Sequence, residues 1–232
     1  MTAMSHMDKR YWWVLLALLV LTACGGGGSD SDPQPAAVDR QSFTFRLTNL
    51  TANQPLSPPA LVFHSDRIHL WAVGDSADAG LEVLAESGDP QPFIDGAAMQ
   101  TAVAAALTGE GVIPPGGQDT LTVELTSSGE WVLTLATMLV NTNDAFAGAS
   151  NLPLPELDVG EGYTWLLPAY DAGTEGNTET QGTVPGPATG GEGFNPDRDD
   201  TDRIAIHPGV ISNQDGLTSA ALDGSHRWDN PV

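Results

Sequence analysis

Residues 41–50 read QSFTFRLTNL, and this stretch decides the fold class. Along it Phe43, Phe45 and Leu47 alternate with polar residues, so that every second side chain is apolar. A period of two is typical of a β-strand with one buried and one solvent-exposed face. Residues 120–125 (TLTVEL) repeat the pattern. The sequence therefore predicts two half-buried strands far apart in the chain.

Five further apolar or β-rich stretches, each bounded by Gly, Pro, Asn or Asp, predict additional strands. They are residues 58–64, 67–73, 131–140, 163–167 and 203–207. Residues 76–86 and the alanine-rich residues 94–107 look helical instead. Short strands without alternating βαβ units favour an all-β antiparallel sandwich with two short helices in its connections. Residues 173–202 are polar and rich in Gly and Pro, and they predict a long loop between late strands.

The composition agrees with a turn-rich domain. The 232 residues include 26 glycines and 17 prolines, and only 16% are charged. Hydrophobic residues make up 41%, which is too many for a disordered acidic tail and enough for the core of one domain. The net charge is −22, so the chain offers no basic surface for phosphate groups, and we expect no nucleic-acid partner.

The N-terminus has the pattern of a targeting signal. Lys9 and Arg10 precede an apolar run over residues 11–21, which is too short for a stable span of about 20 residues. Residues 21–24 (LTAC) resemble the bacterial lipobox, whose cysteine is lipidated after cleavage. We therefore predict a lipoprotein signal peptide over residues 1–23 and a lipid anchor at Cys24, which is the only cysteine of the chain.

The predicted anchor has consequences for the rest of the chain. Residues 24–40, rich in Gly, Ser, Asp and Pro, are expected to be a flexible tether between the membrane and the domain. With Cys24 acylated, no thiol remains for a disulfide, a thiolate metal site or a cysteine nucleophile. Gly25, where lipoproteins retained in the inner membrane typically have Asp, favours the outer membrane by resemblance to lipoprotein sorting rules. The expected location is the bacterial envelope, with the protein periplasmic or surface-exposed.

Four ordered blocks resemble the spondin domain. They are residues 42–59 (SFTFRLTNLTANQPLSPP), 74–89 (GDSADAGLEVLAESGD), 135–146 (LATMLVNTNDAF) and 170–177 (YDAGTEGN). The resemblance implies a spondin domain over residues 41–232, with the fold of a C2-like β-sandwich of about eight antiparallel strands. Members of this family also continue past a region similar to residues 228–232 into a final strand, so that strand is expected to be missing or supplied differently.

The same resemblance implies a calcium ion bound in loops at one end of the sandwich. Carried over position by position, its ligands would be Asp144, Asp171 and Glu175. Ca²⁺ takes six to eight oxygen ligands, and backbone oxygens would complete the shell. The intervening Ala-Gly-Thr of residues 172–174 allows a tight turn that brings two of the carboxylates together. The alternative is that these acids are solvated turn formers.

Residues 195–202 are a second candidate for a cation loop. They contain four acids, but they lack the glycine and the terminal glutamate that an EF-hand loop needs at fixed positions. The alternative is a solvated charge run, partly offset by Arg198 and Arg203. Whether this loop binds a second ion stays open.

Histidines and catalytic motifs give little support for an enzyme. His64, His69, His207 and His226 include no pair four residues apart on a helix, and we expect structural roles for them. The chain has no nucleophile elbow, phosphate-binding loop or dinucleotide-binding glycine motif. The sequence favours a non-enzymatic, calcium-binding envelope lipoprotein that mediates adhesion or binds extracellular protein or glycan partners. The alternatives are a periplasmic or surface hydrolase and a purely structural envelope component.

Overall fold

The structure is a computed structural model that describes residues 38–217 and 220–227. These described residues belong to one compact unit. The predicted signal peptide, the lipidation site Cys24 and residues 24–37 of the predicted tether lie outside the described residues. The first strand begins at Arg40, the last residue of the predicted tether. No helix of the described part combines the length and the apolar character needed to cross a membrane.

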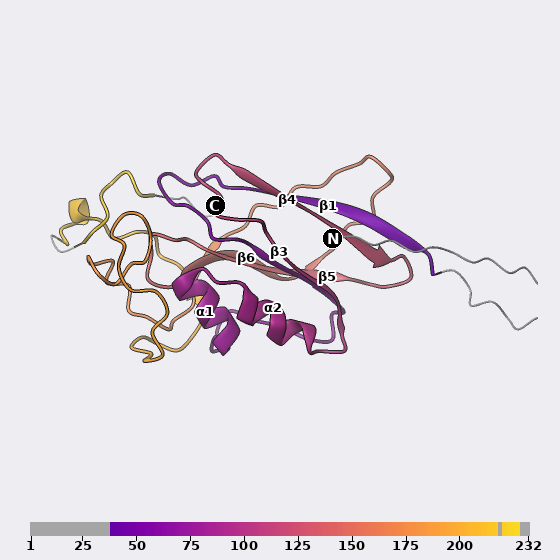
Figure 1. Ribbon diagram of the computed structural model, residues 1–232, viewed down its shortest axis with the longest axis horizontal. Coiled ribbons are helices and arrows are strands. Elements are labelled where there is room, and N and C mark those ends of the chain that lie inside the picture. The colour runs from indigo at the N-terminus through magenta and orange to yellow at the C-terminus, as the bar shows by residue number, and fades with distance from the viewer. Residues whose placement is uncertain (1–37, 218–219, 228–232) are drawn as a thin grey trace, which may run out of the picture. The chain divides into compact units, whose positions relative to one another are not determined.

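Two antiparallel sheets and two helices make up the domain (Figure 1). The first sheet pairs β1 (Arg40–Thr48) with β4 (Gln118–Thr126). The second has the order β3 (Val103–Thr108), β2 (Ala60–His64), β5 (Val132–Met138), β6 (Ala145–Pro153), β7 (Ala169–Asp171) and β8 (Ala205–Ile206). The helices are α1 (Ala79–Ser87) and α2 (Gln91–Ala98), and a 3₁₀ turn covers Asn213–Asp215. The predicted all-β antiparallel sandwich with two short helices is confirmed.

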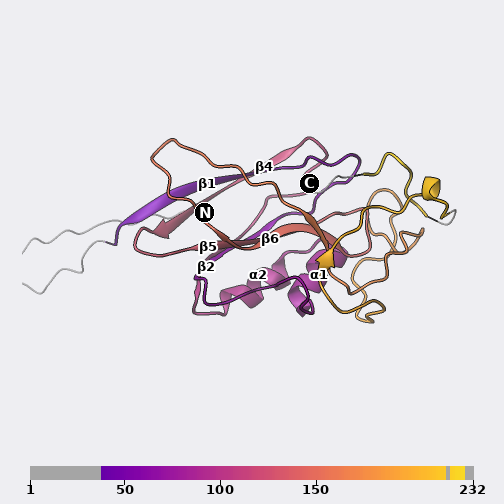
Figure 2. The ribbon, with the colours of Figure 1, turned by 180° about the vertical axis from the view of Figure 1, so that it is seen from behind.

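The six-stranded sheet is the middle layer of the domain. The helices cover one face of it and the β1–β4 pair lies over the other, as the opposite views of Figures 1 and 2 both show. Strand β2 contributes to both interfaces: Ala60 and Val62 pack in the cluster on the helical side, whereas Leu61 and Phe63 pack against β4. Because both of its faces are covered, every residue of β2 is buried. Such a strand has a continuous apolar run instead of an alternating pattern.

Helix α1 agrees with the sequence prediction, and its ends have identifiable causes. The side chain of Asp78 accepts a hydrogen bond from the backbone N–H of Leu81, which caps the first turn. Gly88 ends the helix in the left-handed conformation, with φ of 74°.

The helix predicted over residues 94–107 is wrong beyond Ala98. Residues 103–108 form β3 instead, which pairs with β2 in a register that places Leu61 opposite Leu107. Alanine favours helix in isolation, but here the edge of β2 offers hydrogen-bond partners, and the pairing overrides that preference.

Residues 67–73 were predicted as a strand, and this prediction is wrong. Their backbone is held by side chains of β6: Asn151 donates to the carbonyl of Ile68 at 2.9 Å, and Ser150 donates to that of Trp71. Trp71 itself lies against Phe146, with ring centroids 5.1 Å apart. The apolar run therefore covers the core as an irregular segment.

Two predicted strands late in the chain also differ from the structure. Residues 163–167 form no strand, and the strand predicted over 203–207 is reduced to the two residues of β8. Strands β6 and β7 were not predicted, because the first half of β6 is buried on both faces and so does not alternate, and β7 has only three residues. A pattern of alternating hydrophobicity cannot detect either.

Candidate metal centre

The sheet register brings Asp144 and Asp171 together. Asp144 ends the turn between β5 and β6, and the next residue, Ala145, pairs with Asp171 at the end of β7. The backbone N–H of Ala172 donates to the carbonyl of Asp144 at 3.2 Å. Two carboxylates 27 positions apart in the sequence thus lie on neighbouring strand ends.

The carboxylate of Asp144 organises the turn that follows β7. Its Oδ2 accepts hydrogen bonds from the backbone N–H of Thr174 at 2.8 Å and of Glu175 at 3.1 Å, and from the Thr174 hydroxyl at 3.2 Å. Its Oδ1 is buried and has no hydrogen-bond partner. The side chain is 0% exposed, so neither water nor another described group stabilises this oxygen.

Residues 171–175 form the tight turn that the sequence predicts around Gly173. Asp171 Oδ1 accepts the backbone N–H of Gly173 at 2.7 Å, and Gly173 has φ of 72°. A Cβ atom at Gly173 would lie 2.4 Å from the carbonyl oxygen of Arg203. All three acids implied by the resemblance, Asp144, Asp171 and Glu175, therefore belong to one small structural unit.

Glu86 and Asp199 add carboxylates that sequence reasoning did not assign to this centre. Glu86, in the last turn of α1, is 0% exposed; its Oε2 accepts the backbone N–H of Asn195 at 2.8 Å, and its Oε1 has no partner. Asp199 Oδ1 accepts the N–H of Gly176 at 2.8 Å. The sequence offered one indication of this role, because Glu86 lies among apolar residues of α1. The structure shows that it is buried with them.

The electrostatics of this centre favour protons or a cation. Burial, and next the charge of Asp171, raise the pKa of Asp144 to about 7. Burial, and next the charges of Glu86, Asp144 and Asp199, raise the pKa of Glu175 to about 8. Burial also raises the pKa of Glu86. Among the described residues no arginine forms an ion pair with these acids. The charge of Arg198 opposes the raised pKa of Glu86 without direct contact.

Asp171 is oriented by a short chain of side chains. The ring of His207 accepts the N–H of Gly209 at Nδ1 over 3.0 Å, so its Nε2 donates to Asn177 Oδ1 at 3.1 Å. The amide of Asn177 in turn donates to Asp171 Oδ2. Burial lowers the pKa of His207 to about 4, which keeps the ring neutral. Asn177 and His207 are positioning residues. The sequence predicts a structural role for His207, but it does not indicate that this ring reaches Asp171 through Asn177.

The acidic residues 195–202 pack against the same turn. The N–H of Asp202 donates to the carbonyl of Gly173 at 2.7 Å, and that of Asp199 donates to the carbonyl of Thr174 at 3.1 Å. Arg198 forms an ion pair with Glu82 at 2.7 Å and another with Asp202. Of the four acids, Asp202 binds Arg198 and Asp199 binds the turn, and the described residues hold no group of three acids placed to bind one ion.

The predicted structural role of the histidines fits the contacts of His64 as well. Its Nδ1 lies 2.8 Å from the carbonyl oxygen of Ser65 and its Nε2 lies 2.8 Å from the hydroxyl of Thr134. Burial lowers the pKa of His64. The Nε2 contact joins β2 to β5, whereas the Nδ1 contact stays local, with the residue that follows β2.

The donor set fits a hard divalent cation in chemistry, although its geometry is not preformed. In the described part of the chain, no three His, Asp or Glu side chains already surround one point closely enough to hold a metal ion. Two carboxylate oxygens, Asp144 Oδ1 and Glu86 Oε1, are nevertheless buried without a partner next to a surplus of negative charge. Oxygen-only donors of this kind suit Ca²⁺ better than zinc, which prefers nitrogen and sulfur.

Comparison of the chain with protein-family models and with curated proteins gave no match.

Proposed function

We propose that this protein is a spondin-type, calcium-binding lipoprotein of the bacterial envelope, in which Ca²⁺ orders loops that bind extracellular protein or glycan partners. One observation carries the calcium part: Asp144 keeps a buried, unpartnered carboxylate oxygen among three further acids. Asp144, Asp171 and Glu175 would hold the ion, and Glu86 lies beside them. The bound ion would supply the positive charge that this centre lacks.

A hydrolase is less well supported by the same residues. The raised pKa values of Asp144 and Glu175 are typical of a general acid, but both side chains are buried. The cavity of about 650 Å³ between the two sheets is lined by none of these acids. A substrate held there would not reach them, so we propose a non-enzymatic role.

Calcium is expected to stabilise the unit Val38–Val232, which holds every described strand, helix and core cluster and so should fold without residues 1–37. At a calcium concentration about 100-fold above Kd, the gain is about 2.7 kcal/mol, which raises Tm by roughly 5–10 °C. Replacing Asp171→Asn and Glu175→Gln together should abolish the rise, because two charged ligands are lost. Thermal unfolding with calcium and with EDTA measures both.

The matched control for this experiment is Asp66→Asn with Glu192→Gln, which removes the same charge from two exposed residues outside both candidate cation sites. Its rise in Tm should equal that of the unmodified unit. An equal rise in the Asp171/Glu175 variant would place the ion elsewhere, and no calcium-dependent rise in any protein would reject the calcium centre.

The envelope part of the proposal has a separate test. Cys24→Ser is expected to abolish incorporation of labelled palmitate and to release the protein from the membrane fraction, because one or more acyl chains supply the anchoring energy. Ser29→Ala, in the predicted tether, is the control and should stay labelled. Labelling that persists in Cys24→Ser would contradict the anchor without bearing on the calcium centre.

A further inference from the structure

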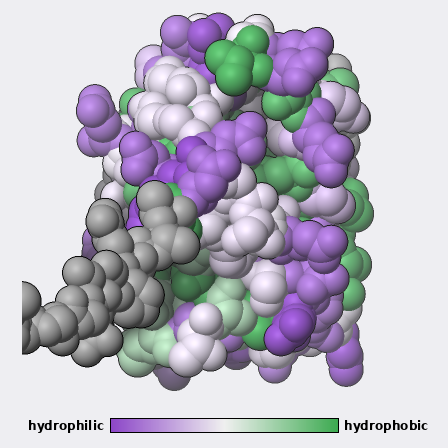
Figure 3. Space-filling model, turned by 90° about the vertical axis from the view of Figure 1, so that its right-hand side faces the viewer, coloured by the Kyte–Doolittle hydropathy of each residue, from purple (hydrophilic) through white to green (hydrophobic). Residues whose placement is uncertain are grey.

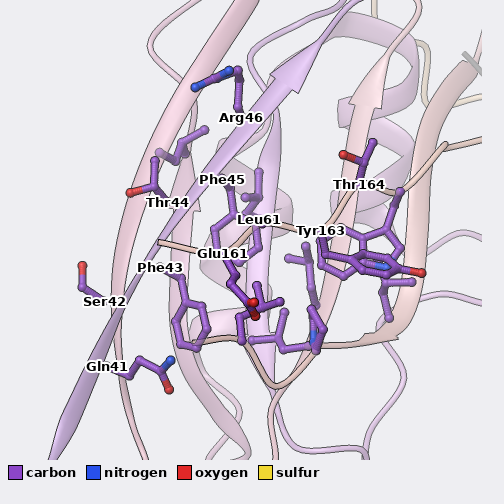
Figure 4. Close-up of a pocket in the computed structure, with 18 of the residues that line it drawn as sticks. Gln41, Ser42, Phe43, Thr44, Phe45, Arg46, Leu61, Glu161, Tyr163 and Thr164 are labelled. Atoms are coloured by element: carbon purple, nitrogen blue, oxygen red, sulfur yellow. The ribbon is translucent and has the colours of Figure 1, made fainter. Parts of the chain in front are cut away.

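The cavity between the two sheets lies along the free edge of β1. We call it the β1 slot. One wall consists of residues 40–47 of β1, the opposite wall of residues 157–165, and the floor includes Leu61, Leu133, Leu135 and Leu152. Its volume is about 650 Å³. Figure 4 shows the rings of Phe43 and Phe45 on the inner side of β1, whereas Ser42, Thr44 and Arg46 point away.

Strand β1 has backbone groups that nothing in the described structure satisfies. It pairs only with β4, and in an antiparallel pair alternate residues direct their N–H and C=O groups to the other edge. No backbone hydrogen bond joins residues 40–48 to any described residue outside β4. The open edge runs for eight residues, about 26 Å, beside an apolar floor. Unpaired edges of this kind are templates for another strand.

The inner side chains of β1 are also incompletely covered. Phe43, Phe45 and Leu47 are half-buried, although they face the core. On the opposite wall, Tyr163 and Trp165 lie against each other with ring centroids 5.0 Å apart, in a segment that forms no strand. At the end of the domain where β1 begins, hydrophobic residues lie in a recess between hydrophilic ones (Figure 3).

From these contacts we infer that β1 accepts an extended peptide of a partner protein as a third strand of the β1–β4 sheet. The backbone of the guest would pair with the open edge, and its alternate side chains would fill the slot above Leu133 and Leu135. A fatty acid or another small apolar molecule would cover the floor but leave the backbone groups of β1 without partners. The edge therefore favours a peptide.

The charge of β1 indicates which peptide fits. Arg40 and Arg46 lie on the exposed face of a strand that contains no acid, and neither forms an ion pair with any described residue. A guest whose outer residues are Asp or Glu would supply these ion pairs. A second copy fits less well, because antiparallel β1–β1 pairing would bring four arginines together and join two chains of charge −22. The expected guest alternates apolar and acidic residues.

A displayed library of random ten-residue peptides, selected against Val38–Val232, tests this inference. Enriched sequences should alternate apolar and acidic residues. The best peptide, made synthetically, should lose at least tenfold in affinity when alternate amides on its pairing edge are N-methylated, because methylation removes donors while keeping the apolar side chains. N-methylation of the other alternate amides should matter much less.

A second test reverses the charge of the two arginines of β1. Arg40→Glu with Arg46→Glu should weaken binding about tenfold at low salt and less at high salt. Arg67→Glu with Arg203→Glu makes the same change away from the slot and should bind normally.

Several results would overturn the inference. Library selection that enriches no alternating sequence would do so, as would equal affinity of both N-methylated peptides and the unmodified one. Dodecanoate binding that changes Trp165 fluorescence while no peptide binds would make the slot a lipid site. Dimerisation abolished by Phe45→Asp, again without peptide binding, would make it a self-association surface. None of these results depends on calcium, so none of them bears on the proposed calcium site.

Discussion

Gly173→Ala is expected to lower the free energy of unfolding by about 3 kcal/mol, combining left-handed backbone strain with overpacking. Gly173 has φ of 72°, and an added Cβ would lie 2.4 Å from the carbonyl oxygen and 2.6 Å from the backbone nitrogen of Arg203. Backbone atoms cannot move aside as a flexible side chain can. Urea denaturation of the two proteins, compared at one pH with EDTA present, measures the loss.

Gly190→Ala separates the two causes. Gly190 also has a positive φ, of 63°, but an added Cβ would meet nothing within 4 Å. This variant should therefore show only the conformational cost, about 1 kcal/mol. If Gly173→Ala were no more destabilising than Gly190→Ala, the turn after β7 would not pack on Arg203 as described.

The same substitution should affect calcium as well as stability. Gly173 lies between Asp171 and Glu175, and its N–H donates to Asp171 Oδ1 at 2.7 Å. Displacing the turn moves both carboxylates relative to Asp144. The calcium-dependent rise in Tm should therefore shrink in Gly173→Ala and stay complete in Gly190→Ala.

Local patterns predicted the strands with one buried and one exposed face. The alternation at Phe43, Phe45 and Leu47 identified β1, and the same pattern identified β4. The apolar runs over residues 58–64 and 131–140 also identified strands, β2 and β5, which are buried on both faces. Prediction failed where pairing decides the conformation. The alanines of residues 103–108 favour a helix, but these residues pair with the edge of β2 and form strand β3. Local sequence contains no information on which edge is available.

Some residues of the candidate centre could be predicted from the sequence, and others could not. The resemblance named Asp144, Asp171 and Glu175, and the structure places them around one turn. Glu86 comes from α1, 58 residues before Asp144, and joins them only because α1 packs on the sheet. His207 reaches Asp171 through Asn177, which no spacing rule describes. Residues brought together by tertiary packing require the fold before they can be assigned.

The second large effect is expected at Glu179, which is not a proposed ligand. Its backbone N–H donates at 2.9 Å to Asn143, whose side chain donates to Glu175, so Glu179 contacts the centre through Asn143. Its side chain is 0% exposed; Oε2 accepts the N–H of Ile211 at 2.6 Å, and Oε1 is buried without a partner. Its carbonyl accepts the N–H of Ala221 at 2.7 Å, so this residue holds two later parts of the chain. Burial, opposed by the Ile211 hydrogen bond and assisted by the charge of Asp215, raises the pKa of Glu179 to about 8.

A raised pKa makes this group destabilising at high pH. In the unfolded chain the carboxyl of Glu179 loses its proton near the ordinary value of 4.5, whereas in the folded protein it keeps the proton to about pH 8. Between these values the folded state binds more protons, so stability falls as pH rises. The contribution is fully present below about pH 4.5 and is lost by about pH 8.

Glu179→Gln is therefore expected to stabilise the protein at pH 8, by about 3 kcal/mol, and to change little at pH 4.5. Glutamine has the shape of the protonated acid and can still accept the Ile211 N–H, but it does not titrate. Urea denaturation from pH 4.5 to 8.5, in EDTA, should show a smaller fall with pH in the variant. Asp144 and Glu175 titrate in both proteins, so the difference between the two curves isolates Glu179. Glu192→Gln, at an exposed position, should leave the curve unchanged; parallel curves for Glu179→Gln and the unmodified protein would show that Glu179 is charged in the fold.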